Sequence, residues 1–98
     1  MKRREPVRAD LNNELYKAIL LLQTPKECKD FFGDLCTPAE LEALADRWQV
    51  AKMLIDETPY RTISEKAGVS VTTVTRVARC LNYGESGYKR ILKRLGLL

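Results

Sequence analysis

The residues whose types and spacing could do chemistry lie in one stretch, Thr58 to Leu81, with the sequence TPYRTISEKAGVSVTTVTRVARCL. From Ser70 onward this stretch contains hydroxyl and guanidinium side chains and no acid. Hydroxyls can hydrogen-bond base edges or phosphates, threonine methyls can contact thymine methyls, and arginines can bind guanine or phosphate. These side chains are therefore suited to contact with duplex DNA.

A helix-turn-helix, with helices expected at about 59–67 and 71–82, would position these side chains. Apolar residues recur at the offsets that two short helices packed at a steep angle require; they are Ile63, Ala67, Val69, Val74 and Val77. Gly68 falls at the turn, where a left-handed backbone would clash with a Cβ atom. Ser70 offers a hydroxyl to cap the second helix. Ser64 departs from the pattern, since alanine is usual at the tightest contact between the helices.

The second helix would present a polar outer face. Its N-terminal part should reach deepest into the major groove, where base edges are exposed. The residues expected to discriminate bases are Ser70, Val71, Thr72, Thr73, Thr75 and Arg76. Arg61 and Arg79 are expected to contact phosphates and to supply salt-dependent affinity. An ordinary helical pair with a β-branched core would give the same apolar pattern.

The charge distribution also favours a polyanion partner. The net charge is +4 and the pI about 9.1. Residues 1–9 carry a net +3, residues 10–59 a net −5 and residues 60–98 a net +6. A basic segment that is also folded is typical of nucleic-acid binding, although solubility alone could explain it.

The pattern elsewhere predicts an all-α chain. Further helices are expected at about 10–23, 25–34, 38–56 and 85–95, which makes six. Three helix starts pair a threonine N-cap with a proline: Thr24-Pro25, Thr37-Pro38 and Thr58-Pro59. Two of them also predict capping boxes, Thr24 with Glu27 and Thr37 with Glu40.

Two of these helices carry extensive apolar surface. In the first, Leu20 and Leu21 extend the surface around most of the circumference, so burial on a second side, by another subunit, is expected. The long helix has a predicted buried stripe of Leu41, Leu44, Ala45, Trp48, Ala51 and Ile55. We expect Trp48 to lie in the core or in a dimer interface.

Several function classes are not expected. The three cysteines, Cys28, Cys36 and Cys80, match no zinc spacing, and the chain has no histidine, so no metal site is predicted. We expect them to be reduced core residues of a cytoplasmic protein. The longest apolar run, 18–22, is too short for a membrane span. No glycine-rich phosphate loop or apolar carboxylate pair indicates an enzyme.

The sequence resembles the Trp repressor superfamily, and most closely its TrpR-like YerC/YecD family. The resemblance runs through LCTPAELEALADRWQVAKMLIDE and ISEKAGVSVTTVTRVARCLNYG and covers about two thirds of the chain. It implies a six-helix, intertwined homodimer in which each subunit's helix-turn-helix binds half of a two-fold operator. It also implies that the first and last helices contribute to the shared core.

The chain departs from the repressor at the effector pocket. In the repressor proper, two arginines hold tryptophan beside a glycine. Arg47 and Arg76 match the arginines, but Val77 stands at the glycine and Cys80 at a nearby serine. A β-branched side chain should fill the slot for the indole, and a thiol is a weak acceptor. We therefore expect no tryptophan cofactor.

The termini leave alternatives open. Residues 88–95 form a basic amphipathic segment that could bind a membrane or a partner, although closure of the dimer core by Ile91, Leu92 and Leu95 is the preferred interpretation. Residues 1–9 are expected to form a flexible basic arm, with or without phosphate contacts, before a DNA-binding domain at 10–98. The predicted function is a sequence-specific transcription regulator, a repressor. The alternatives are a protein-interaction module and a non-specific architectural DNA-binding protein.

Overall fold

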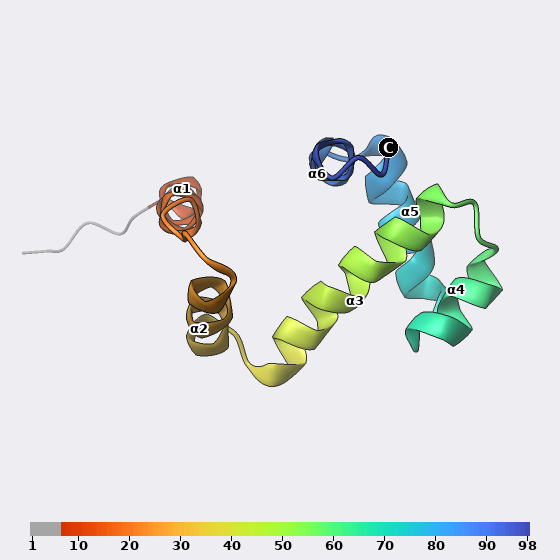
Figure 1. Ribbon diagram of the computed structural model, residues 1–98, viewed down its shortest axis with the longest axis horizontal. Helices are drawn as coiled ribbons and strands as arrows, with labels where there is room; N and C mark the ends of the chain where they lie inside the picture. The colour runs from red at the N-terminus through yellow and green to blue at the C-terminus, as the bar shows by residue number, and fades with distance from the viewer. Residues whose placement is uncertain (1–6) are drawn as a thin grey trace, which may run out of the picture. The chain divides into compact units, whose positions relative to one another are not determined.

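The computed structural model describes residues 7–98 and shows six α-helices without a β-strand in that range (Figure 1). The helices are α1 (Arg8–Ile19), α2 (Pro25–Leu35), α3 (Pro38–Ile55), α4 (Tyr60–Ala67), α5 (Val71–Tyr83) and α6 (Gly87–Arg94). The all-α, six-helix prediction is confirmed. Contacts within the chain define two compact units, one ending at Cys36 and the other running from Thr37 to Leu98.

The first unit has no core of its own among the described residues. Neither α1 nor α2 contains a buried residue. The helix α1 begins at Arg8, inside the segment predicted as an arm, and ends at Ile19, four residues before the predicted end. Leu20 and Leu21 follow in a turn and are 83% and 76% exposed. The predicted arm residues Lys2, Arg3 and Arg4 lie outside the described residues.

The two threonine-capped helix starts differ in detail. At α3 the capping box is complete: Glu40 N–H donates to Thr37 Oγ1 at 3.2 Å, and Thr37 N–H donates to Glu40 Oε1 at 2.9 Å. Hydrogen bonding from the Thr37 backbone, and to a smaller extent from its side chain, lowers the pKa of the Glu40 carboxyl. At α2, Glu27 N–H donates to Thr24 Oγ1 at 3.1 Å, but the Glu27 carboxylate accepts from Gln23 N–H at 2.9 Å. The capping box predicted there is therefore only half formed.

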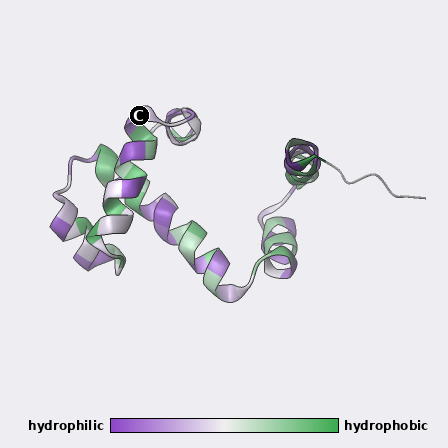
Figure 2. Ribbon diagram, turned by 180° about the vertical axis from the view of Figure 1, so that it is seen from behind, coloured by the Kyte–Doolittle hydropathy of each residue, from purple (hydrophilic) through white to green (hydrophobic). Residues whose placement is uncertain are grey.

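The second unit is built around a buried cluster where α4 and α5 pack on the C-terminal half of α3. The cluster consists of Val50, Ala51, Ile63, Val74 and Val77. Trp48, Ala67, Val69 and Tyr88 pack against it from the periphery. Figure 2 shows the apolar bands of α3 and α5 on the segments that meet. The five predicted helix-turn-helix core residues all lie in or against this cluster, which confirms that part of the sequence analysis.

The predicted stripe of the long helix is partly wrong. Leu41 and Leu44 are 37% and 41% exposed, and Val50, which was not in the stripe, is fully buried. The prediction assumes that α3 buries one face along its whole length. In the structure, the buried residues of α3 are those against which α4, α5 and α6 pack. Trp48 is half-buried and its ring stacks on Tyr88, with centroids 6.2 Å apart and planes 14° apart.

The cysteine prediction is also wrong in part. All three thiols are free, but Cys28 and Cys80 are exposed and Cys36 is only partly buried. Helix α2 buries none of its residues, and α5 buries Val74, Val77, Ala78 and Leu81 while leaving Cys80 outside. Apolar neighbours in sequence therefore did not indicate burial. None of the helices within 7–98 combines the length and hydropathy that a membrane crossing requires.

Candidate nucleic-acid interface

The turn between α4 and α5 has the geometry that its glycine predicts. Gly68 adopts φ 69° and ψ 33°, in the left-handed region, and ends α4. Its N–H donates to the Ser64 carbonyl at 3.0 Å. Residues 68–70 then join α4 to α5, so the turn of the helix-turn-helix is short.

Ser64 stabilises this turn more directly than the sequence suggested. Its carbonyl accepts from Val69 N–H at 3.2 Å as well as from Gly68 N–H, and its hydroxyl donates to the Val69 carbonyl at 2.5 Å. An alanine would keep the backbone bonds but lose the hydroxyl bond. The departure from alanine therefore adds a side-chain bond across the turn, and only the five-residue spacing to Val69 could have indicated it.

The start of α5 is fixed by a side-chain cap. Thr73 N–H donates to Ser70 Oγ at 3.1 Å, which confirms the predicted cap, and the hydroxyls of the two residues are also 3.1 Å apart. Two residues after Thr73, Thr75 Oγ1 donates to the Val71 carbonyl at 3.0 Å. Three of the predicted base-contacting hydroxyls thus have intramolecular partners, whereas Thr72 is exposed at the same end of the helix.

The cap predicted for α4 is wrong. The N-cap of α4 is Pro59, no side chain caps the helix, and the first helical residue is Tyr60. Thr58 N–H instead donates to the Met53 carbonyl at 3.4 Å. Thr58 therefore bonds back to the last turn of α3 and does not cap α4.

The outer face of α5 combines hydroxyl, guanidinium and apolar side chains around two hollows. One hollow of about 350 Å³ is lined by Val71, Thr72, Thr75, Arg76 and Arg79. A second, of about 420 Å³, is lined by Tyr60, Thr75, Ala78, Arg79, Asn82 and Tyr83. The two hollows share Thr75 and Arg79, and neither lining contains an acid. Arg61 is exposed in the first turn of α4 but lines neither hollow.

The second hollow contains residues that the sequence analysis missed. Tyr83 is 87% exposed and Tyr60 is 42% exposed, and Asn82 lines the hollow with them and with Arg79. The available signal was the spacing Thr75, Arg79, Asn82, which places three polar side chains on one helical face. The structure adds the tyrosine from α4, which no pattern within α5 could supply.

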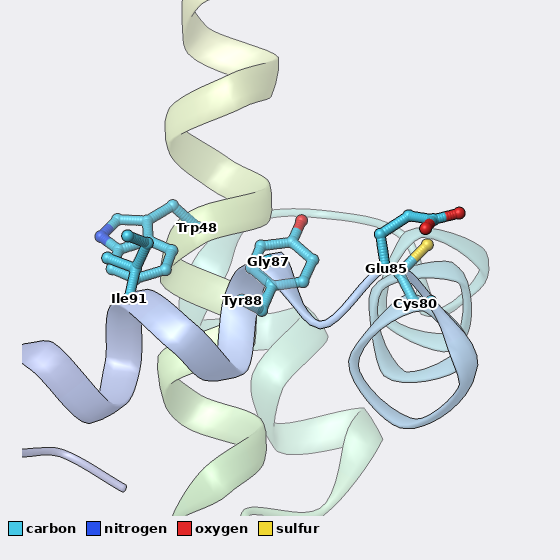
Figure 3. Close-up of a pocket in the computed structure, with 7 residues that line it drawn as sticks. Trp48, Cys80, Glu85, Gly87, Tyr88 and Ile91 are labelled. Atoms are coloured by element: carbon cyan, nitrogen blue, oxygen red, sulfur yellow. The ribbon is translucent and has the colours of Figure 1, made fainter. Parts of the chain in front are cut away.

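The four candidate effector residues do not line one hollow. Val77 is 1% exposed and belongs to the core, and Arg47 is half-buried on α3. Arg76 lines the first hollow of the α5 face. Cys80 lines a separate hollow of about 740 Å³ with Trp48, Tyr88 and Ile91 (Figure 3). No cluster of metal-ligating side chains occurs in the part of the chain that the structure describes.

Comparison with known proteins places this geometry in a family. A family model described as Trp repressor protein matches residues 11–96. A Bacillus subtilis protein, YerC, described as uncharacterised, is 43% identical over 83 residues, which are 85% of this chain and 80% of YerC. A Chlamydia caviae protein named Trp operon repressor homolog is 32% identical over 76% of this chain and 74% of its own.

Solved structures agree with the sequence comparisons. A candidate Trp repressor from Staphylococcus aureus superposes with a TM-score of 0.87 at 42% identity, over 93% of this chain and 91% of that one. A TrpR-like protein from Eubacterium eligens gives 0.87 at 45% identity, over 93% and 94%. The chain belongs to the Trp repressor family.

Proposed function

We propose that the protein is a sequence-specific DNA-binding transcription regulator that acts as a repressor. The observation that carries the proposal is the acid-free face of α5 with its threonines and arginines, held on a helix-turn-helix whose turn is bonded through Ser64. A rigid support matters because base discrimination depends on placing a few side chains at fixed positions in the groove.

The face suggests a division of roles. Thr72 and Arg76, in the N-terminal half of α5, are exposed and would contact base edges together with the neighbouring residues 70–75. Arg79 and Arg61 would contact phosphates. Tyr60 and Tyr83 lie beside Arg79 in the second hollow, where phenol hydroxyls could donate to the same strand.

We infer a homodimer as the DNA-binding form. The apolar side chains of Leu20 and Leu21 have no cover in the described chain, and the apolar hollow at Trp48 is open. A second copy could cover both surfaces, as the family resemblance implies for an intertwined dimer. Two recognition helices would then meet half-sites about 34 Å apart.

The proposal includes no tryptophan cofactor. Val77 packs in the core, and Arg76 and Cys80 line different hollows, which supports the absence of a tryptophan pocket. Calorimetry with free tryptophan is expected to show no binding, and saturable binding would contradict this part. We place the protein in the cytoplasm, where a bacterial-type regulator meets DNA and its free thiols stay reduced.

The decisive experiment is selection of binding sites from a random duplex pool at near-physiological salt. An enriched motif with two-fold symmetry and half-sites one helical turn apart is expected. Recovery of DNA without a motif would favour an architectural protein. No recovery would favour a protein-interaction module.

Two substitutions test the division of roles once a site is known. Thr72→Ala should relax base preference without changing the dependence of affinity on salt. Arg79→Ala should weaken binding to all sequences about equally and reduce the salt slope by about one unit. Lys29→Ala, which removes one exposed cation from α2, is the matched control and should change neither quantity. Identical behaviour of Thr72→Ala and Arg79→Ala would contradict the assignment.

A further inference from the structure

Residues 60–98 carry a net charge of +6, and half of this charge lies outside the helix-turn-helix. Helix α6 carries four exposed cations, Lys89, Arg90, Lys93 and Arg94, and no acid. Ser86, Lys89, Arg90 and Lys93 line a hollow of about 250 Å³. The ion pair found among residues 7–98 joins Lys26 and Asp30. The four cations of α6 therefore have no carboxylate within 4.0 Å in the described chain.

Local electrostatics do not account for this arrangement. Lys93 and Arg94 lie in the last turn, where the helix dipole favours positive charge. Lys89 and Arg90 lie near the start of the helix, where the dipole disfavours it. The pairs Lys89–Lys93 and Arg90–Arg94 also place like charges four residues apart, which destabilises a helix.

The start of α6 is open as well as positively charged. Ser86, the N-cap residue, has φ 66° and its side chain accepts no bond from the first turn. The opposite face fixes the helix, because Leu92 is fully buried and Tyr88 stacks on Trp48. The three cations and the serine hydroxyl are therefore supported by a docked helix.

We infer that this hollow binds a phosphate group. Phosphate supplies the negative charge that the cluster lacks and accepts hydrogen bonds from lysine, arginine and serine together. The phosphate could belong to a free phosphorylated ligand or to the DNA backbone, and the chemistry of recognition is the same. The hollow lies on a different helix from the α5 face, so this inference can fail separately from the proposed regulator function.

The test uses the full-length protein and a triple variant, Lys89→Gln, Arg90→Gln and Lys93→Gln. The matched control removes the same charge from the first unit through Lys17→Gln, Lys26→Gln and Lys29→Gln. Pyrophosphate is titrated at constant ionic strength while backbone amides are followed by NMR. Saturable shifts at residues 86–93 are expected for wild type and control, with affinity at least tenfold weaker in the triple variant.

DNA binding distinguishes the two sources of phosphate. If the backbone occupies the hollow, the triple variant should reduce the salt slope by about two to three units. If a free ligand occupies it, the slope stays at the wild-type value while the pyrophosphate response is lost. Equal pyrophosphate affinity in the triple and control variants, together with an unchanged slope, would overturn the inference. Complete absence of DNA binding by wild type would contradict the regulator function alone, since the pyrophosphate titration still decides this site.

Discussion

The two units of the chain treat their apolar side chains in opposite ways. From Thr37 to Leu98, residues of four helices form or flank a cluster that includes the fully buried Ile63. In the first unit, α1 and α2 bury no residue, although Leu20 and Leu21 are apolar. Helix formation itself differs little between the units, since both contain threonine-capped helices. The difference is that the second unit contains helices that bury its apolar side chains, whereas the first unit does not.

The largest effect should come from the core of the second unit. Ile63→Ala removes a fully buried side chain and is expected to lower the free energy of unfolding by about 2–5 kcal/mol. Denaturant unfolding followed by circular dichroism measures it. A loss below 1 kcal/mol would mean that this cluster does not carry the stability of the unit.

A smaller effect, of a different kind, is expected in the first unit. The double substitution Leu20→Ser and Leu21→Ser should weaken self-association about 100-fold, or about 2.7 kcal/mol, because these leucines would be buried only by a second copy. Sedimentation analysis measures the dissociation constant. Val71 on the outer face of α5 is 49% exposed, and Val71→Ser serves as the control. Unchanged association in the first variant would contradict the proposed dimer surface.

The two capping threonines allow a matched comparison of the units. Thr37→Ala should cost about 1 kcal/mol of unfolding free energy, because it removes a cap from a helix that belongs to the core. Thr24→Ala should leave the same transition of the monomer unchanged, since α2 buries no residue. Equal losses in dilute protein would show that the two units unfold together.

The smallest expected effect is a dependence of stability on pH. The pKa of Glu40 is lowered from 4.5 by its bonds with Thr37. The stabilisation is therefore fully present above the unfolded value and is lost as pH falls through the lower, folded pKa. Glu40→Gln should flatten this acid limb slightly in a denaturant series between pH 2 and 7. Glu42→Gln, which changes an exposed acid two residues further along α3, should leave the limb unchanged.

The sequence predicted most where local rules and packing coincide. Ile63, Ala67, Val69, Val74 and Val77 were all identified, and so was the left-handed glycine at position 68. The sequence-based prediction failed where contact with a neighbouring helix determines which residues are buried or cap a helix. Val50 is buried because α4 and α5 cross α3 there, and Thr58 serves the end of α3 rather than the start of α4. Tyr60 joins the α5 face from another helix, which spacing within one helix cannot reveal.

The stacking of Trp48 on Tyr88 has a practical consequence. Trp48 is the one tryptophan in the sequence, and its ring lies between the long helix that supports the core and the last helix. Its fluorescence emission therefore reports on the docking of α6 without any attached dye. The Trp48 emission can be followed in stopped-flow mixing with DNA or pyrophosphate. A change in this emission would show that the last helix moves when a ligand binds.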